Sequence, residues 1–157
     1  MADARFEDAD EAPLYLGAET PEDLAVISAL VQDAVFPITE MAFQRRQRRF
    51  AILLNRFRWE DRAAAEAAGR SYERVQAVLA VDGVLSVRSQ GITRAEKDLV
   101  LSILSLDFEP GEDGAGRVML VLAGDGVVAL EVEALEVTLK DVTRPYMAPS
   151  GRVPGHG

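Results

Sequence analysis

Apolar residues recur at spacings of three and four along residues 21–34, and this spacing places side chains on one face of a helix. Thr20 precedes the segment, Pro21 opens it, and Glu22 and Asp23 follow. A hydroxyl cap, an initial proline and early acidic residues all favour a helix start. The sequence therefore predicts one main helix over 21–34, with a core-facing stripe formed by Leu24, Ile27, Leu30, Val31 and Ala34.

Beyond this helix the apolar period changes to two, which indicates consecutive antiparallel strands. A first hairpin is predicted from residues 41–43, a polar tip at 44–49 and a return strand at 50–59. The alanine-rich segment 60–71 suits a short exposed helix or an insertion that Gly69 ends. On the return strand, alternation predicts an inward face of Ala51, Leu53, Phe57 and Trp59, with Arg56 and Arg58 on the opposite face.

Two further hairpins are predicted from turn residues. Asp82-Gly83 lies between strands 75–81 and 84–89, and both residues accept the positive φ of a two-residue turn. The second hairpin joins 118–123 to 127–132 through Gly-Asp-Gly, and a long strand over 99–108 lies between the two hairpins. In the first of these hairpins, the pairing predicts one apolar face made of Val78, Ala80, Leu85 and Val87.

The apolar phase slips near Ala134, from even positions before it to odd positions after it. A β-bulge or a change of sheet explains this slip, and a terminal helix over 133–141 is the alternative. About seven strands and one main helix predict an α+β fold whose antiparallel sheet is curved, either barrel-like or a sandwich. The expected organisation is an acidic leader (1–13), a single domain (14–142) and a tail rich in proline and glycine (143–157).

Composition removes several classes of chemistry. The 157 residues include no cysteine, which excludes disulfides, thiolate catalysis and cysteine-ligated metals. The single histidine, His156, lies in the tail, so the folded region lacks the usual proton carrier near neutral pH. No run of apolar residues is long enough to cross a membrane, and the acidic N-terminus does not resemble a secretory signal. We therefore expect a cytoplasmic protein without a cofactor or metal.

Charge is distributed unevenly along the chain, whose net charge is −9. The region from Arg45 to Arg74 holds nine basic and four acidic residues, whereas the region from Glu96 to Asp141 holds eleven acidic and three basic ones. Either neighbouring strands pair these charges within the molecule, or a polar surface meets charged partners. The overall acidity predicts no binding to nucleic acid or to a membrane, because both require a positive field.

Three segments resemble a known family. They are PEDLAVISALVQDA at 21–34, RRF at 48–50 with NRFRWE at 55–60, and DGVLSVRSQGI at 82–92. Over residues 14–142 the chain is similar to an uncharacterised family of bacterial proteins, domain of unknown function 2948. The resemblance implies a small single-domain cytosolic protein, and it implies no activity, ligand or catalytic residue.

Six arginines are the candidate binding residues. Those at the predicted hairpin tip, Arg45, Arg46, Arg48 and Arg49, would grip a phosphate or carboxylate, or would form a solvated turn that protects a strand edge. Arg56 and Arg58 alternate with aromatic residues, as in RNA-binding sheets, but alternation also suits aromatic side chains packed inside.

The acidic residues Glu131, Glu133, Glu136 and Asp141 would suit a metal site or acid–base pair, yet an exposed strand face explains them better. No phosphate-binding glycine motif precedes a helix. We therefore expect a non-catalytic binding or assembly protein that acts through a sheet surface, with a protein partner or a second copy of itself. The alternative is a sensor or enzyme that recognises an anionic small molecule through arginine and carboxylate residues.

Overall fold

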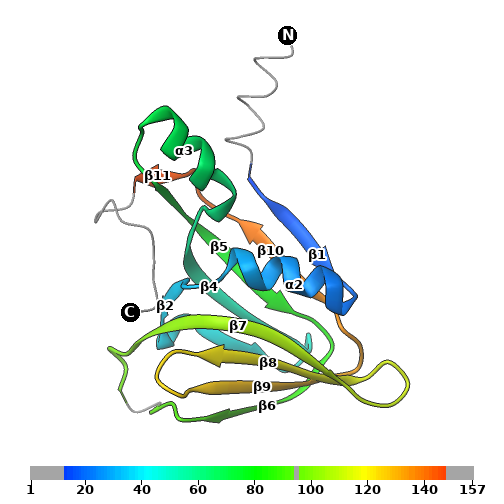
Figure 1. The fold of residues 1–157 in the computed structure, drawn as a ribbon. Helices are drawn as coiled ribbons and strands as arrows, with labels where there is room; N and C mark the ends of the chain where they lie inside the picture. Colours follow the sequence, from blue (N-terminus) through cyan, green and yellow to red (C-terminus); the bar gives the residue numbers. More distant parts are fainter. Residues whose placement is uncertain (1–12, 94–95, 148–157) are drawn as a thin grey trace.

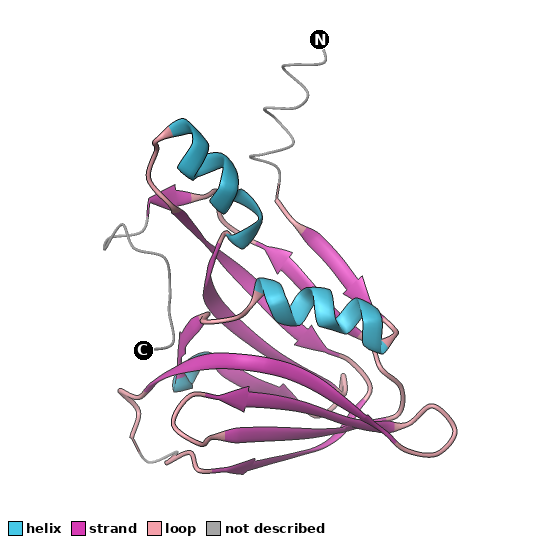
Figure 2. Cartoon of the chain, in the orientation of Figure 1, coloured by secondary structure: helices cyan, strands magenta, loops and turns pink. Residues whose placement is uncertain are grey.

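The computed structural model describes residues 13–93 and 96–147 (Figure 1). Eleven strands form one antiparallel sheet with the main order β1-β10-β5-β4-β2-β7-β8-β9-β6, while β3 pairs with β4 and β11 with β5 outside this path. The path ends in β1 and β6, so the sheet curves without closing (Figure 2). The strands are β1 (Tyr15–Ala18), β2 (Val35–Pro37), β3 (Met41–Gln44), β4 (Arg49–Phe57), β5 (Glu73–Val81), β6 (Val84–Gln90), β7 (Val100–Pro110), β8 (Gly116–Leu122), β9 (Val127–Val132), β10 (Val137–Asp141) and β11 (Tyr146–Met147).

Strand β7 connects the two halves of the sheet. Its first residues pair with β2, and from Ile103 onwards it pairs with β8. The predicted fold class, α+β with a curved antiparallel sheet, is confirmed. The described residues contain eleven strands rather than about seven, because strands as short as β2 and β11 contain too few residues to produce an alternating pattern.

Helix α2 (Pro21–Leu30) begins as predicted but ends four residues earlier. The Thr20 side chain accepts a hydrogen bond from the Asp23 N–H at 3.2 Å. After Leu30 the chain turns through Asp33, whose φ is 62°, and the Asp33 N–H bonds the carbonyl of Ile103 on β7. The helix stops early because the chain must join β7 there. Val31 and Ala34 are nevertheless buried, as the stripe predicted.

Two hairpins and the second helix agree with the sequence. Strands β3 and β4 pair around the arginine-rich tip, and β8 and β9 pair around a turn in which Gly124 and Asp125 both have positive φ. Helix α3 (Arg62–Ala68) ends at Gly69, whose φ is 64°. Two short 3₁₀ helices, η1 (Ile38–Glu40) and η2 (Trp59–Asp61), flank β3 and α3. None of the helices in the described part of the chain is long and apolar enough to span a membrane.

The predicted hairpin at Asp82-Gly83 is wrong. Strand β5 pairs with β4 on one edge and β10 on the other, and β6 pairs with β9. The Asp82 N–H bonds the carbonyl of Glu136, and the Glu133 N–H bonds the carbonyl of Gly83. The turn residues therefore form a corner between the two halves of the sheet. Since both edges of β5 are already occupied, β6 has no edge of β5 left to pair with.

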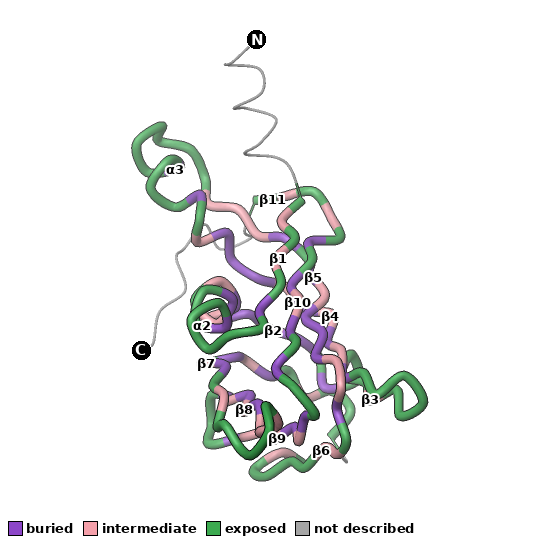
Figure 3. The backbone as a smooth tube through the Cα atoms, turned by 90° about the vertical axis from the view of Figure 1, so that its right-hand side faces the viewer, coloured by how far each residue is buried: buried purple, intermediate pink, exposed green. Residues whose placement is uncertain are grey.

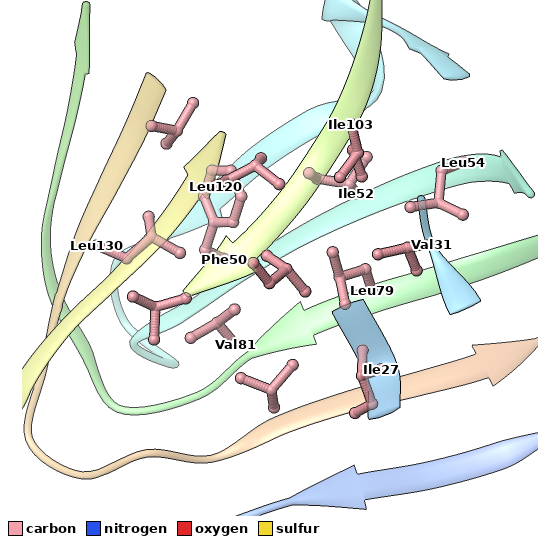
Figure 4. Close-up of a cluster of buried hydrophobic side chains, with 14 of the residues drawn as sticks. Ile27, Val31, Phe50, Ile52, Leu54, Leu79, Val81, Ile103, Leu120 and Leu130 are labelled. Carbon is pink, nitrogen blue, oxygen red and sulfur yellow. The ribbon is translucent and has the colours of Figure 1, made fainter. Parts of the chain in front are cut away.

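The inward faces predicted for β4 and for the hairpin over 75–89 are wrong in part. In the hairpin, Ala80 is buried and Val87 packs against the core, but Val78 and Leu85 do not belong to it. On β4 the core side chains include Ile52 and Leu54 rather than Ala51 and Leu53, and Leu85 on β6 is 54% exposed. The core instead gathers side chains from α2 and from both halves of the sheet (Figure 4). It is formed by residues such as Ile27, Ile52, Leu79, Ile103 and Leu130.

Phe57 is buried, but it packs on the opposite face of β4 from Ile52. Its ring lies 4.7 Å from that of Trp59 and 5.7 Å from that of Tyr72, measured between centroids. The Trp59 indole N–H donates to the carbonyl of Gln32 at 3.0 Å. Aromatic packing inside the molecule was predicted correctly, and so was the position of Phe57 on the face of β4 that carries Ala51 and Leu53. The prediction that this face forms the central core was wrong.

The phase slip near Ala134 marks a change between the two halves of the sheet. Strand β9 pairs with β6 and β8, whereas β10 pairs with β1 and β5. Of the region 133–141, residues Val137–Asp141 form strand β10 and no part forms a terminal helix. Of the predicted tail, residues 143–147 are described, and Tyr146 and Met147 form β11 against β5. The predicted leader lies outside the described residues, apart from Pro13.

Candidate functional site

The four arginines at the tip of the β3–β4 hairpin have different surroundings. The side chain of Arg48 pairs with Glu133, and the Arg49 Nε donates to Asp82 at 2.9 Å. The Asp82 carboxylate raises the pKa of Arg49. Arg45 lies over the ring of Phe43, 5.7 Å from its centroid. The tip therefore does not present four free guanidinium groups side by side.

Arg56 is fully buried at the end of β4, between two carboxylates. Its Nε and Nη2 donate to Asp141 at 3.0 and 2.9 Å, and its Nη1 and Nη2 donate to Glu60 at 2.8 and 2.7 Å. A fifth hydrogen bond runs from Nη1 to the carbonyl of Phe57. A guanidinium has five N–H groups. All five are used within the chain, so Arg56 offers no donor to a ligand in this structure.

Arg58 continues the buried charge network under α3. Its Nη1 donates to Glu73 at 2.6 Å and lies 3.7 Å from Asp61. Asp61 in turn accepts two hydrogen bonds from Arg70, at 2.6 and 2.8 Å. Since Arg56 pairs with Asp141 on β10, the basic region and the acidic region of the chain are linked within the molecule, as one of the two interpretations of the charge pattern predicted.

The contacts within the network shift the pKa values of Arg56, Glu60 and Asp61. Burial by itself would lower the pKa of Arg56 and raise that of Glu60, but the hydrogen bonds between the two groups reverse both shifts. The pKa of Glu60 is thus below its ordinary value of 4.5, and the bonds from Arg70 lower that of Asp61 below 3.8. The Glu60 and Asp61 carboxyl groups and the Arg56 guanidinium are therefore charged near neutral pH.

A carboxylate whose pKa is lower in the folded state stabilises that state above its unfolded pKa, and this contribution is lost as the pH falls through the folded pKa. We therefore expect the free energy of unfolding, measured by urea denaturation, to decrease as the pH falls below about 4.5. The Glu60→Gln variant should show a shallower decrease. An equal pH dependence in both proteins would contradict this assignment.

A hollow of about 600 Å³ lies at the other end of the molecule, between β3 and β6. We call it the β3–β6 hollow. Its apolar lining comes from β3, β6 and η1, and its two basic residues come from the hairpin tip and from the turn before β7. The described residues that line it are Ile38, Thr39, Met41, Phe43, Arg45, Val87 and Lys97.

Arg45 and Lys97 are the charged residues of this lining, and no carboxylate of the described residues forms an ion pair with either. The side chains that face the core side of the sheet, Met41, Phe43 and Val87, are partly exposed there. No carboxylate, tyrosine or histidine belongs to the described lining. The hollow therefore offers apolar contact and positive charge, but no acid–base pair.

The structure brings only Arg45, of the six predicted arginines, to this hollow. Lys97, Met41 and Phe43 were not predicted as site residues, because β3 and the turn before β7 meet only through the tertiary fold. Two other hollows, of about 440 and 450 Å³, lie beside Arg88 and Leu135. Arg117 in the first of these pairs with Glu131 at 2.6 Å.

The four acidic residues considered for metal binding do not converge. Glu131 pairs with Arg117, Glu133 with Arg48, and Asp141 with Arg56. Within residues 13–93 and 96–147, no cluster of three or more acidic or histidine side chains is arranged to hold a metal ion. Three of the four carboxylates therefore serve as partners of arginines.

Comparison with known proteins places the chain in a family. No curated protein and no solved structure matches it. One family profile, described as "Protein of unknown function (DUF2948)", matches residues 14–156. This match covers nearly the whole chain and agrees with the resemblance found in the sequence, so the chain belongs to the DUF2948 family of proteins of unknown function.

Proposed function

We propose that this chain is a non-catalytic binding protein that recognises an anionic, partly apolar partner at the β3–β6 hollow. The observation that carries the proposal is the pairing of an apolar lining with two basic residues that have no acidic partner among the described residues. Pockets of 300–1,000 Å³ with apolar walls and a few polar groups are typical of ligand sites. The hollow falls within that range.

The same observations favour binding over catalysis. The buried arginines and carboxylates, which form the densest set of titratable groups, satisfy one another inside the fold. The lining of the hollow supplies positive charge without a matching general acid or base. We further propose that the protein does not bind nucleic acid, because Arg48 and Arg49 at the tip already have acidic partners. We also propose that it acts in the cytoplasm.

Anilinonaphthalene sulfonate tests the proposal directly, since this probe combines an apolar ring system with one negative charge. We expect its fluorescence to rise in a saturable way when it binds the full chain. The variants Arg45→Ala and Lys97→Ala should each weaken binding by about two- to fivefold, as expected for an exposed charge pair. Salt should weaken binding as well.

Arg46→Ala is the matched control, because Arg46 neighbours Arg45 in the tip but does not line the hollow. This variant should bind the probe like the unchanged protein. If Arg45→Ala and Lys97→Ala also bind like the unchanged protein, the hollow is not the site and the proposal fails.

A further inference from the structure

The edge of β3 away from β4 carries peptide groups that pair with none of the described strands. In a strand, successive residues direct their N–H and C=O groups to opposite edges. The Arg58 N–H bonds the carbonyl of Glu73, so the even-numbered residues of β4 bond β5. Arg49 and Ala51 therefore bond β3, where they pair with Gln44 and Ala42. Phe43, between these two residues, directs its N–H and C=O to the other edge, where none of the described strands pairs.

The same reasoning applies to β6. The Leu122 N–H bonds the carbonyl of Gly126, which places the even-numbered residues of β9 against β8. The odd-numbered residues of β9 therefore bond β6, and Ala129 pairs with Arg88. Val87 consequently directs its N–H and C=O away from β9. On that side, too, none of the described strands pairs with β6.

These two free edges border one space. Phe43 and Val87 both line the β3–β6 hollow. At one end the Val84 N–H bonds the carbonyl of Arg48, which joins the start of β6 to the tip of the β3 hairpin. Figure 3 shows this hairpin projecting from the body as an exposed segment. Beyond the Val84–Arg48 bond, the two edges are separated by the hollow.

We propose that an extended acidic peptide occupies the β3–β6 hollow as an added strand and bonds the free peptide groups of Phe43 and Val87. This inference rests on the proposed function and names its partner class. Strand addition takes its affinity from main-chain hydrogen bonds and its selectivity from pockets for alternate side chains. Met41, Phe43 and Val87 offer apolar contact to every second side chain, while Arg45 and Lys97 favour acidic residues at the ends.

A defined peptide tests this inference. The probe is a fluorescent peptide as long as β6, seven residues, in which glutamate and valine alternate and glutamate occupies both ends. We expect saturable binding with a dissociation constant below about 1 mM. Added salt should weaken this binding, because it screens the charges of Arg45 and Lys97. A peptide with lysine in place of glutamate should bind more weakly, because Arg45 and Lys97 would repel it.

N-methylation separates strand addition from simple contact. One version of the peptide is methylated on every valine nitrogen and another on every glutamate nitrogen, so that each lacks the N–H donors of one edge. At least one version should bind about tenfold more weakly or worse. If both bind like the unmethylated peptide, strand addition is wrong, while the result with anilinonaphthalene sulfonate still decides the proposed function separately.

Amide hydrogen exchange of the full chain gives a second readout. The bound peptide should slow exchange at Phe43 and Val87, and Val87→Pro should weaken binding because proline removes one of these N–H groups. Val87→Thr is the matched control, since threonine has nearly the same shape and keeps the N–H group that proline removes. Three results would each overturn the inference. The peptide does not bind, exchange changes at neither amide, or the protein forms a dimer that the peptide does not disrupt.

Discussion

Replacement of Arg56 with methionine is expected to lower the free energy of unfolding by about 3–5 kcal/mol. Arg56 is 0% exposed, and its removal leaves Asp141, itself buried, and the half-buried Glu60 without their shared cation. An uncompensated buried charge is far more costly than a lost surface pair. Urea denaturation followed by Trp59 fluorescence measures this loss. The effect is a large fraction of the ~5–15 kcal/mol that stabilises a typical domain.

Arg62→Ala is the matched control, because Arg62 forms an ion pair with Glu66 on an exposed face of α3. Its expected cost is about 0–1 kcal/mol. If Arg56→Met is too unstable to study, the double variant Arg56→Met/Asp141→Leu should recover part of the loss, since it removes both buried charges. Equal stability of Arg56→Met and Arg62→Ala would show that the network contributes nothing to folding.

Leu79→Ala is expected to lower the free energy of unfolding by about 2–5 kcal/mol, whereas Leu85→Ala should change it by about 0.5 kcal/mol or less. The two leucines flank the Asp82-Gly83 corner. Leu79 is 2% exposed and belongs to the central core, whereas Leu85 is 54% exposed on β6. The same chemical change therefore removes core packing at one position and little at the other.

This pair of variants distinguishes the observed sheet from the simple hairpin that the sequence predicts. A hairpin with Val78, Ala80, Leu85 and Val87 on its inner face would reverse the two results. Chemical denaturation of both variants under one set of conditions measures the difference. A larger loss of stability for Leu85→Ala than for Leu79→Ala would contradict the observed pairing and would favour the predicted hairpin between β5 and β6.

The candidate site was accessible to sequence reasoning only in part. Arg45 attracted attention because it belongs to a dense run of like charges, and it does line the β3–β6 hollow. Its neighbours Arg48 and Arg49 find acidic partners in Glu133 and Asp82, which lie far along the chain. Pairing of this kind depends on which strands become neighbours, and composition does not contain that information.

Arg56 shows the limit most clearly. Its place in an alternating strand suggested a solvent-facing side chain, because a charged side chain rarely enters a core. The structure buries it because Glu60 and Asp141 approach from η2 and β10 and satisfy every donor. Only Glu60, four residues away, lies near in sequence, whereas Asp141 is 85 residues distant.

The sequence alone determined the features that depend on neighbouring residues. The Thr20 cap and Pro21 set the start of α2, Gly69 ended α3, and the Gly-Asp-Gly turn closed the β8–β9 hairpin. Each of these features is governed by local backbone preferences and short-range hydrogen bonds. The α+β class followed from them, because the hydrophobic period changes from three or four to two within one chain.

The tertiary structure alone decided which strands pair, which faces are buried and where the hollow lies. Asp82-Gly83 has the chemistry of a hairpin turn, yet β4 and β10 occupy both edges of β5 and leave β6 to pair with β9. A shift of one residue in the register of a strand reverses which side chains face the core, since the side-chain period of a strand is two. The free edges of β3 and β6 exist because the curved sheet stays open, and this depends on contacts between residues far apart in the sequence.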